Sequence, residues 1–194
     1  MSSKCQIPFL FLVAVFIIWS CGSKDKSEKK LPDVTTSQTP YNQAKESKSS
    51  LHIGGTYSFG DNVEQGPIGS VIVYPLTDSS ALFFLDVCRG APSYNLGQLF
   101  GQITLKDSIG IYDSKTEGDD FDCILTFKFS LRKLEVITES GHDDCGFGAN
   151  VYTDHEYKKI DSSIPKYFID GHGDTSIFDG LTVEKYNHRF DLIQ

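Results

Sequence analysis

Apolar and polar residues alternate with a period of two through most of the chain after residue 50, which is typical of β-strands with one buried face. The clearest stretch is Phe121–Phe129. Its odd positions are Phe, Cys, Leu, Phe and Phe, and its even positions are Asp, Ile, Thr and Lys. One face of this stretch therefore packs in a core and the other mostly meets water. The pattern places Cys123 on the inward face.

Further stretches of the same kind predict strands, separated by turns rich in Gly, Asp, Asn and Ser. They are Gly55–Phe59, Gly69–Leu76, Ala81–Cys88, Gln98–Lys106, Ser108–Asp113, Lys133–Thr138 and Val151–Lys158. The short connections favour hairpins between successive strands. We expect an all-β fold over residues 51–160, a small antiparallel barrel or sandwich of about eight strands. The barrel is preferred because closure removes exposed strand edges.

The alternation fades beyond residue 160 and gives way to helical spacing near the C-terminus. There, Thr182 can cap a short helix, with Glu184 in the first turn and Tyr186 and Phe190 on one face. Residues 161–194 are therefore predicted to form a C-terminal extension that contains this helix and packs on the barrel.

The N-terminus has a different pattern, in which an apolar run follows a single early charge. Lys4 precedes an uninterrupted apolar stretch from Ile7 to Trp19. The stretch is shorter than the about 20 residues that a membrane-spanning helix needs, but it suits the apolar part of a signal peptide. We expect residues 1–20 to be a signal peptide that is removed on export.

The order Ile18-Trp19-Ser20-Cys21 resembles the lipobox of bacterial lipoproteins, in which a small residue precedes the cysteine that becomes acylated. Ser20 fits the pattern, whereas Trp19 is bulkier than usual. The resemblance implies acyl chains, palmitate among them, on Cys21, and two chains anchor a protein stably to a membrane. Gly22 replaces the Asp of an inner-membrane retention signal, which favours the outer membrane of the cell envelope. The alternative is an ordinary secretory signal with an incidental cysteine.

Residues 21–50 are rich in Lys, Ser, Thr, Gln and Glu and contain few large apolar side chains. Such a stretch buries too little surface to offset the entropy lost on ordering. We predict a lipidated, disordered tether with a root-mean-square reach of roughly 30 Å.

The net charge of the chain changes sign at the boundary between the predicted tether and the folded part. Residues 1–50 carry seven Lys against four acidic residues, a net charge of +3, whereas residues 51–194 carry eleven Lys and Arg against twenty-two acidic residues, a net charge of −11. Nucleic-acid binding is excluded because the folded part has no basic stripe. A net charge of −11 would instead attract a cationic protein partner.

Export leaves three cysteines, Cys88, Cys123 and Cys145, in an oxidising compartment. We pair Cys123 with Cys145, because the first faces the core and the second lies in the Gly-rich stretch 141–148, which can fold back over the barrel end. Closing this loop contributes roughly 3 kcal/mol in the chain-entropy model. Cys88 then stays free. Asp86 beside it opposes ionisation, so we interpret Cys88 as a buried structural thiol and not as a nucleophile.

Ligand-type residues also gather in the sequence, at His142, Asp143 and Asp144. They support an alternative function, an envelope hydrolase that uses carboxylate or metal chemistry. Their spacing does not match a zinc motif, and the chain lacks a Gly-x-Ser-x-Gly elbow and a phosphate-binding loop. We therefore predict no catalytic residue, no metal ligand and no cofactor.

The segment Cys145-Gly146-Phe147-Gly148 resembles a recurrent element of small exported bacterial β-domains, and the likeness extends over residues 54–159. Many of these domains have no assigned function. The resemblance implies a lone β-domain with a disulfide and without catalytic residues. Lipid-anchored lysozyme inhibitors share only a distant likeness of architecture with this chain, so no functional residue is carried over from them.

We expect a binding or inhibitor module that engages a protein or an envelope ligand through loops at one barrel end. The candidate contact residues are Pro92, Tyr94, Phe147 and Asn150. Two alternatives remain open, one for the role of this region and one for the function of the whole chain. Phe147 and its flanking glycines can simply plug the barrel end, and the protein can be a purely structural component of the envelope.

Overall fold

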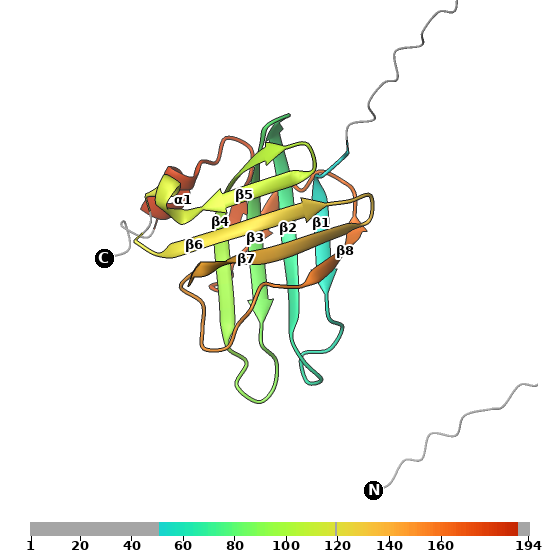
Figure 1. Cartoon of the computed structure of the whole chain (residues 1–194), viewed down its shortest axis with the longest axis vertical. Helices are drawn as coiled ribbons and strands as arrows, with labels where there is room; N and C mark the ends of the chain where they lie inside the picture. The colour runs from blue at the N-terminus through green and yellow to red at the C-terminus, as the bar shows by residue number, and fades with distance from the viewer. Residues whose placement is uncertain (1–50, 119, 190–194) are drawn as a thin grey trace, which may run out of the picture. The chain divides into compact units, whose positions relative to one another are not determined.

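The computed structural model describes residues 51–118 and 120–189 of the chain. The predicted signal peptide, the predicted lipidation site Cys21, the predicted tether and the helix-face residue Phe190 lie outside the described residues. In the described part, eight antiparallel strands form a closed barrel, which confirms the predicted fold (Figure 1).

The strands of the barrel pair in chain order, and the last strand closes on the first. They are β1 (Gly55–Phe59), β2 (Ile68–Thr77), β3 (Ser80–Cys88), β4 (Leu96–Lys106), β5 (Ile109–Asp113), β6 (Asp122–Phe129), β7 (Lys133–Asp144) and β8 (Glu156–Asp161). In Figure 1, β5, β6 and β7 cross in front of the upright strands β1 to β4. The two sides of the barrel therefore face each other across a common core.

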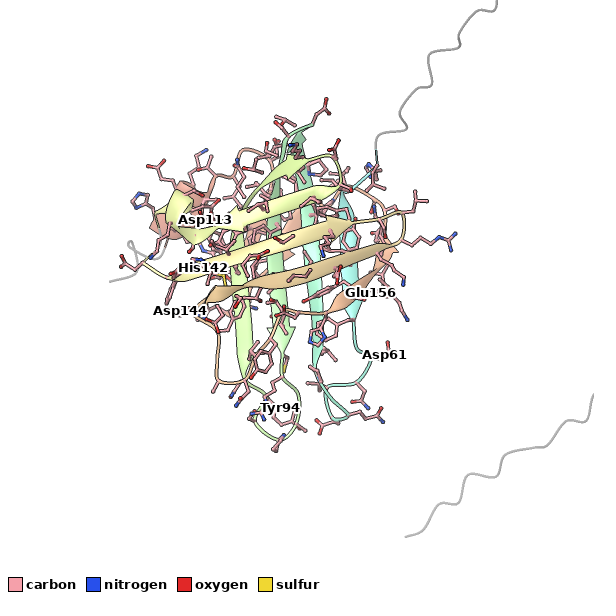
Figure 2. The ribbon with its side chains drawn as sticks, in the orientation of Figure 1. Asp61, Tyr94, Asp113, His142, Asp144 and Glu156 are labelled. Carbon is pink, nitrogen blue, oxygen red and sulfur yellow. A yellow bond between two sulfur atoms is a disulfide. The ribbon has the colours of Figure 1, made fainter. Side chains whose placement is uncertain are left out.

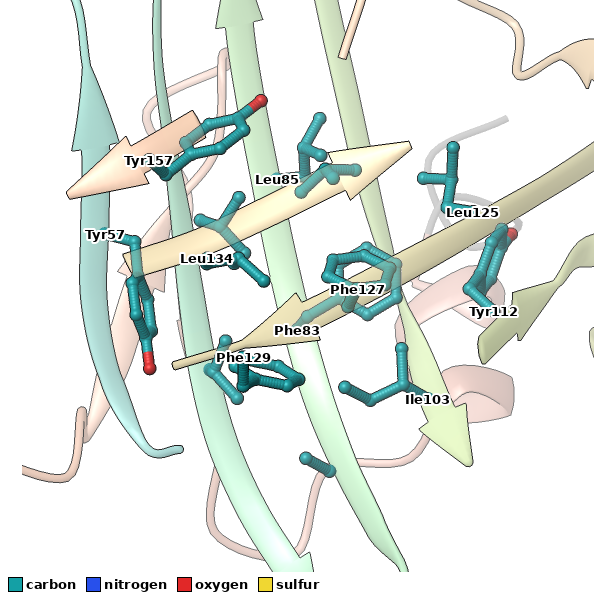
Figure 3. Close-up of a cluster of buried hydrophobic side chains, with 14 of the residues drawn as sticks. Tyr57, Phe83, Leu85, Ile103, Tyr112, Leu125, Phe127, Phe129, Leu134 and Tyr157 are labelled. Atoms are coloured by element: carbon teal, nitrogen blue, oxygen red, sulfur yellow. The ribbon is translucent and has the colours of Figure 1, made fainter. Parts of the chain in front are cut away.

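Large side chains from all of these strands fill the interior of the barrel (Figure 3). The ring centroid of Phe83 lies 5.3 Å from that of Tyr112 and 4.8 Å from that of Phe127. All three side chains are fully buried. The barrel interior is thus a packed core and not a container for a ligand.

Strand β6 shows how the alternating pattern builds this core. Cys123, Leu125, Phe127 and Phe129 are buried, as the sequence predicts. Phe121 is a correction, because its side chain is 48% exposed. It precedes the first residue of the strand, so the pleat does not direct it inward.

Two buried tyrosines fasten the strands that close the barrel. The Tyr57 hydroxyl of β1 donates to the carbonyl of Ile53 at 2.6 Å, and the Tyr157 hydroxyl of β8 donates to the carbonyl of Thr153 at 3.2 Å. Burial raises the pKa of Tyr57 to about 12 and also raises that of Tyr157. Because a buried hydroxyl needs a partner, each tyrosine holds the segment that leads into its own strand.

Strand β3 is buried on both faces, because residues of the C-terminal extension cover its outer side. Leu82 and Phe84 of β3 form a second apolar cluster with Phe100, Phe168 and Phe178. The Phe168 ring stacks on Phe84 with a centroid distance of 4.3 Å and on Phe100 at 5.3 Å. A strand with two buried faces requires a continuous apolar run, which β3 provides.

The extension contains a hairpin that the sequence pattern did not predict. Strands β9 (Tyr167–Ile169) and β10 (Thr175–Ile177) pair with each other in a separate two-stranded sheet. The predicted short helix follows as α1 (Val183–His188), and the Thr182 hydroxyl caps it by accepting from the backbone N–H of Lys185 at 3.2 Å. No helix among the described residues is long and apolar enough to cross a membrane.

A buried ion pair ties the end of the helix to the turn of the hairpin. Asp170 is 7% exposed and bonds to the guanidinium of Arg189. Its other carboxylate oxygen accepts from the backbone N–H groups of His172 at 2.9 Å and Asp174 at 3.0 Å. Burial acts to raise the pKa of Asp170, but these hydrogen bonds and the charge of Arg189 outweigh it and lower the pKa. The carboxylate therefore stays ionised and holds the extension in place.

Candidate functional site

The ladder between β7 and β8 is short and contains three residue pairs, as do the β1–β8 and β4–β5 ladders. Beyond the ladder, residues 150–155 run beside β7 without being part of a strand, and we call them the seam segment. The backbone N–H of Val136 donates to the carbonyl of His155 at 3.1 Å, and beyond this bond side chains link the segment to β7. The Asp154 carboxylate accepts from the backbone N–H of Thr138 at 2.9 Å and from its hydroxyl at 2.8 Å, and the hydroxyls of Thr138 and Thr153 lie 2.9 Å apart.

Two predicted strand boundaries are wrong at this place. Strand β8 begins at Glu156 and not at Val151, because side-chain hydrogen bonds take the place of the ladder along the seam segment. Strand β7 continues to Asp144 instead of ending at Thr138, because a bulge in the β6–β7 ladder lets the two strands pair again after a break.

Three cavities border the seam segment. One of about 650 Å³ lies against Asp154 and His155. A second, of about 340 Å³, is lined by Asn150, Tyr152 and His155 together with residues of the opposite loops, and we call it the mouth pocket. A third, of about 300 Å³, lies against Tyr152 and Asp154 and is called the flank cavity. The seam segment therefore borders several hollows of the described surface.

The mouth pocket lies at the end of the barrel where three connections meet. Its remaining walls are Pro67, from the β1–β2 connection, and Val87 and Arg89, from the end of β3. Pro67 and Val87 give the lining an apolar part, while Arg89 and Asn150 add polar groups.

Direct hydrogen bonds hold the three connections together. The Tyr94 hydroxyl donates to the Glu64 carboxylate at 2.6 Å, which joins the β3–β4 connection to the β1–β2 connection. The Asn95 side chain donates to the carbonyl of Ala149 at 2.6 Å, which joins it to the β7–β8 connection. The barrel end is therefore a connected surface and not a set of independent loops.

The structure brings the predicted contact residues to this barrel end but gives them different roles. Pro92 and Asn150 are exposed, and Asn150 lines the mouth pocket. Tyr94, labelled at the loop tip in Figure 2, is 43% exposed, with its hydroxyl taken by Glu64. Phe147 is half-buried and packs against the core, as the plug interpretation proposed.

Sequence reasoning did not identify Arg89, Tyr152 and His155 as site residues. Tyr152 is 63% exposed, and the ring of His155 stacks on Phe59 with a centroid distance of 3.9 Å. An outward aromatic residue within the predicted strand Val151–Lys158 was a signal that could have pointed to Tyr152. No local signal marks Arg89, because its pocket forms only when distant loops meet.

Cys123 and Cys145 lie at disulfide distance, with their Sγ atoms 1.98 Å apart. The bond connects β6 to the chain that leads from β7 into the seam segment. Cys88 is free and half-buried, and its Sγ accepts from the backbone N–H of Gly90 at 3.4 Å.

The residues of the hydrolase alternative lie at one end of β5, β6 and β7, where Figure 2 labels Asp113, His142 and Asp144. The His142 Nδ1 atom lies 2.8 Å from the Asp122 carboxylate, and Asp143 and Asp144 are exposed. Within residues 51–118 and 120–189, no group of three His, Cys, Asp or Glu side chains lies close enough to hold a metal ion.

We expect the two histidines near these sites to titrate on opposite sides of the usual pKa of 6.5. The hydrogen bond that His142 donates to the Asp122 carboxylate raises the pKa of His142, whereas burial lowers that of His155 despite the nearby Asp154 charge. Protonated His142 therefore stabilises the fold below pH 6.5, and this contribution is lost as the pH rises through its folded pKa. Neutral His155 stabilises the fold above pH 6.5, and this is lost as the pH falls through its folded pKa.

Titration of the histidine ring signals by NMR checks this prediction. The control is Asp122→Asn, which should bring the His142 midpoint down and leave His155 unchanged. Coinciding midpoints for the two rings in the wild-type chain would contradict it.

Comparison with known proteins finds no match to this chain among family models, curated proteins or solved structures.

Proposed function

We propose that this protein is a lipid-anchored binding module of the bacterial cell envelope, which presents the loop end of its barrel to a cationic protein. The lipobox-like sequence ending at Cys21 supports the anchor, and the absence of Asp after it favours the outer membrane. The tether predicted for residues 21–50 would let the barrel reach a partner some distance from the membrane.

The exposed ring of Tyr152 is the observation that carries the proposal. Tyr152 borders both the mouth pocket and the flank cavity, so a partner side chain can pack on either side of the ring. Tyrosine offers a large contact area at a low entropic cost and is enriched among residues that dominate binding energies.

Charge around the seam segment supports a cationic partner. Glu139, Asp143 and Asp154 line the flank cavity, and no Lys or Arg lies among its lining residues. In the 650 Å³ cavity, Lys133 is paired with Glu156 at 2.7 Å. The net charge of −11 over residues 51–194 would steer a cationic protein to this surface, and these acidic groups would orient it.

The packed interior also supports recognition at the outer surface. Because Phe83, Phe127 and Tyr112 occupy the centre of the barrel, a ligand cannot enter it without unfolding the core. Contacts with a partner must therefore come from the loops and the seam segment.

Tyr152→Ala should weaken binding of the full chain to a cationic protein by about tenfold or more, the usual loss for a dominant interface residue. Lysozyme serves as the probe, with its dissociation constant measured by biolayer interferometry and its inhibition assayed in parallel. The matched control is Tyr167→Ala, which removes a similarly exposed tyrosine from β9 and should leave binding unchanged. Equal effects of the two substitutions would contradict the proposed surface. If lysozyme does not bind and affinity capture from envelope extract recovers no other cationic protein, the proposed function is wrong.

A further inference from the structure

We infer that the mouth pocket binds a small organic anion with an apolar body, and that Arg89 holds the anionic group. This inference goes beyond the proposed protein partner, because it assigns a second kind of ligand, a small anion, to the mouth pocket. The size and lining of the pocket, the surroundings of Arg89 and the fixed position of its loop support this assignment.

The pocket has the size and lining of a small-molecule site. Its volume of about 340 Å³ lies within the range of known ligand pockets, roughly 300–1,000 Å³. Pro67 and Val87 supply an apolar wall, the rings of Tyr152 and His155 supply flat surfaces, and Asn150 supplies an amide. An aromatic or aliphatic body fits such a lining better than a purely polar solute does.

Arg89 supplies a positive charge that no carboxylate of the described residues pairs with. Its guanidinium donates to the Ser93 hydroxyl at 3.3 Å, and within the described ranges it has no carboxylate partner. Residues 51–194 contain twice as many acidic as basic residues, so a partner would have been easy to provide. A guanidinium presents paired N–H groups that match the oxygens of a carboxylate, sulfonate or phosphate.

His155 does not compete with Arg89 for the anion at neutral pH. Burial lowers the pKa of His155, so the ring is uncharged and acts as a wall stacked on Phe59. Arg89 is therefore the cationic residue among those that line the pocket, and the position of the anionic group is defined by this one side chain.

The backbone on both sides of Arg89 is fixed. The N–H of Arg89 donates to the carbonyl of Asn95 at 2.9 Å. Gly90, which follows, has a φ of 82°, and a Cβ placed on it would lie 2.3 Å from the carbonyl oxygen of Gly66. Only glycine permits this approach of the two loops, and the approach holds Arg89 at the pocket before any ligand arrives.

The test compares two probes that differ in charge, 2-naphthalenesulfonate and 2-naphthol, on the full chain with Cys21→Ser, which removes the acylation site. Isothermal titration calorimetry should show that Arg89→Gln weakens sulfonate binding by about tenfold or more, the loss of a charge-assisted contact. Naphthol binding should change less than about twofold. Tyr167→Ala should change neither affinity. Unchanged melting temperatures show that each variant is folded.

The inference is wrong if the sulfonate does not bind, if Arg89→Gln leaves its affinity unchanged, or if both probes lose affinity equally. If the sulfonate does bind through Arg89, competition with octanoate and with dihexanoylphosphatidylglycerol distinguishes a free carboxylate from a lipid headgroup as the natural ligand. The ligand class that the pocket binds should displace the sulfonate at millimolar concentration. Displacement by neither overturns the inference. Arg89→Gln should not weaken binding of a cationic protein, so failure here and failure of the proposed function are separate results.

Discussion

Phe168→Ala should lower the free energy of unfolding by about 3–5 kcal/mol, the usual cost of truncating a buried phenylalanine. Phe168 is 1% exposed, and its ring contacts the rings of Phe84, Phe100, Phe178 and Tyr186. Its removal would leave a cavity between the extension and the outer face of β3. Urea denaturation followed by circular dichroism measures the loss, and the slope of the transition shows whether the extension unfolds together with the barrel.

The neighbouring Tyr167→Ala is the matched control for this prediction. Tyr167 belongs to the same short strand but faces the opposite way and is 54% exposed. Its truncation should cost less than about 0.5 kcal/mol, as is usual for surface positions. If the two variants were equally stable, the extension would not be an integral part of the fold.

Replacing both Cys123 and Cys145 with Ala should lower the free energy of unfolding by about 3 kcal/mol. The bond closes a loop with a sequence separation of 22 residues, and the chain-entropy model assigns roughly this value to such a loop. The loss should be accompanied by greater mobility of Phe147, whose segment begins directly after Cys145. Denaturation of wild type and variant, with and without a reducing agent, provides the measurement.

Two controls make the disulfide prediction specific. Cys88→Ala removes the one free cysteine among the described residues and should leave the effect of the reducing agent intact. The reducing agent should destabilise the wild-type chain and leave the double variant unaffected. Equal midpoints for the oxidised and reduced wild-type chain would mean that the bond contributes nothing to stability.

The sequence predicted the barrel well because its strands obey a simple physical rule. One face of β6 meets the core and the other meets water, so the period of two is visible in Phe127, Lys128 and Phe129. The apolar run of β3 contains a further signal. Leu82 and Phe84 break the alternation because a second layer covers them, and a strand in a one-layer barrel would not need them.

The hairpin of the extension escaped prediction because its strands are too short for periodicity to appear. Each has three residues, and only Phe168 and Ser176 face inward. Their turn is organised by the Asp170 carboxylate, which needs Arg189 from nineteen residues further along the chain. Pairing of this kind depends on the tertiary structure and leaves no local pattern.

The sequence predicted the location of the candidate site at one barrel end, but it did not predict which residues form the mouth pocket. Loop residues such as Tyr94 and Asn150 pointed to one barrel end, because hairpin loops of an antiparallel barrel gather at its ends. The mouth pocket could not be predicted, since Arg89 and Tyr152 become neighbours only after three connections have folded against one another. The seam segment was mistaken for a strand because buried and exposed residues alternate along it as in a strand, although the Asp154 side chain, and not the backbone, bonds to the N–H of Thr138.

The ladder between β1 and β8, which closes the barrel, affects how the chain folds during its synthesis. All other pairings of the barrel join consecutive strands, whereas this one joins Thr56 to Asp161 across almost the whole domain. A chain that emerges with its N-terminus first thus exposes one edge of β1 until residues 156–161 appear. During that interval the nascent barrel is an open sheet that can pair with other chains, and a chaperone would have to shield it until closure.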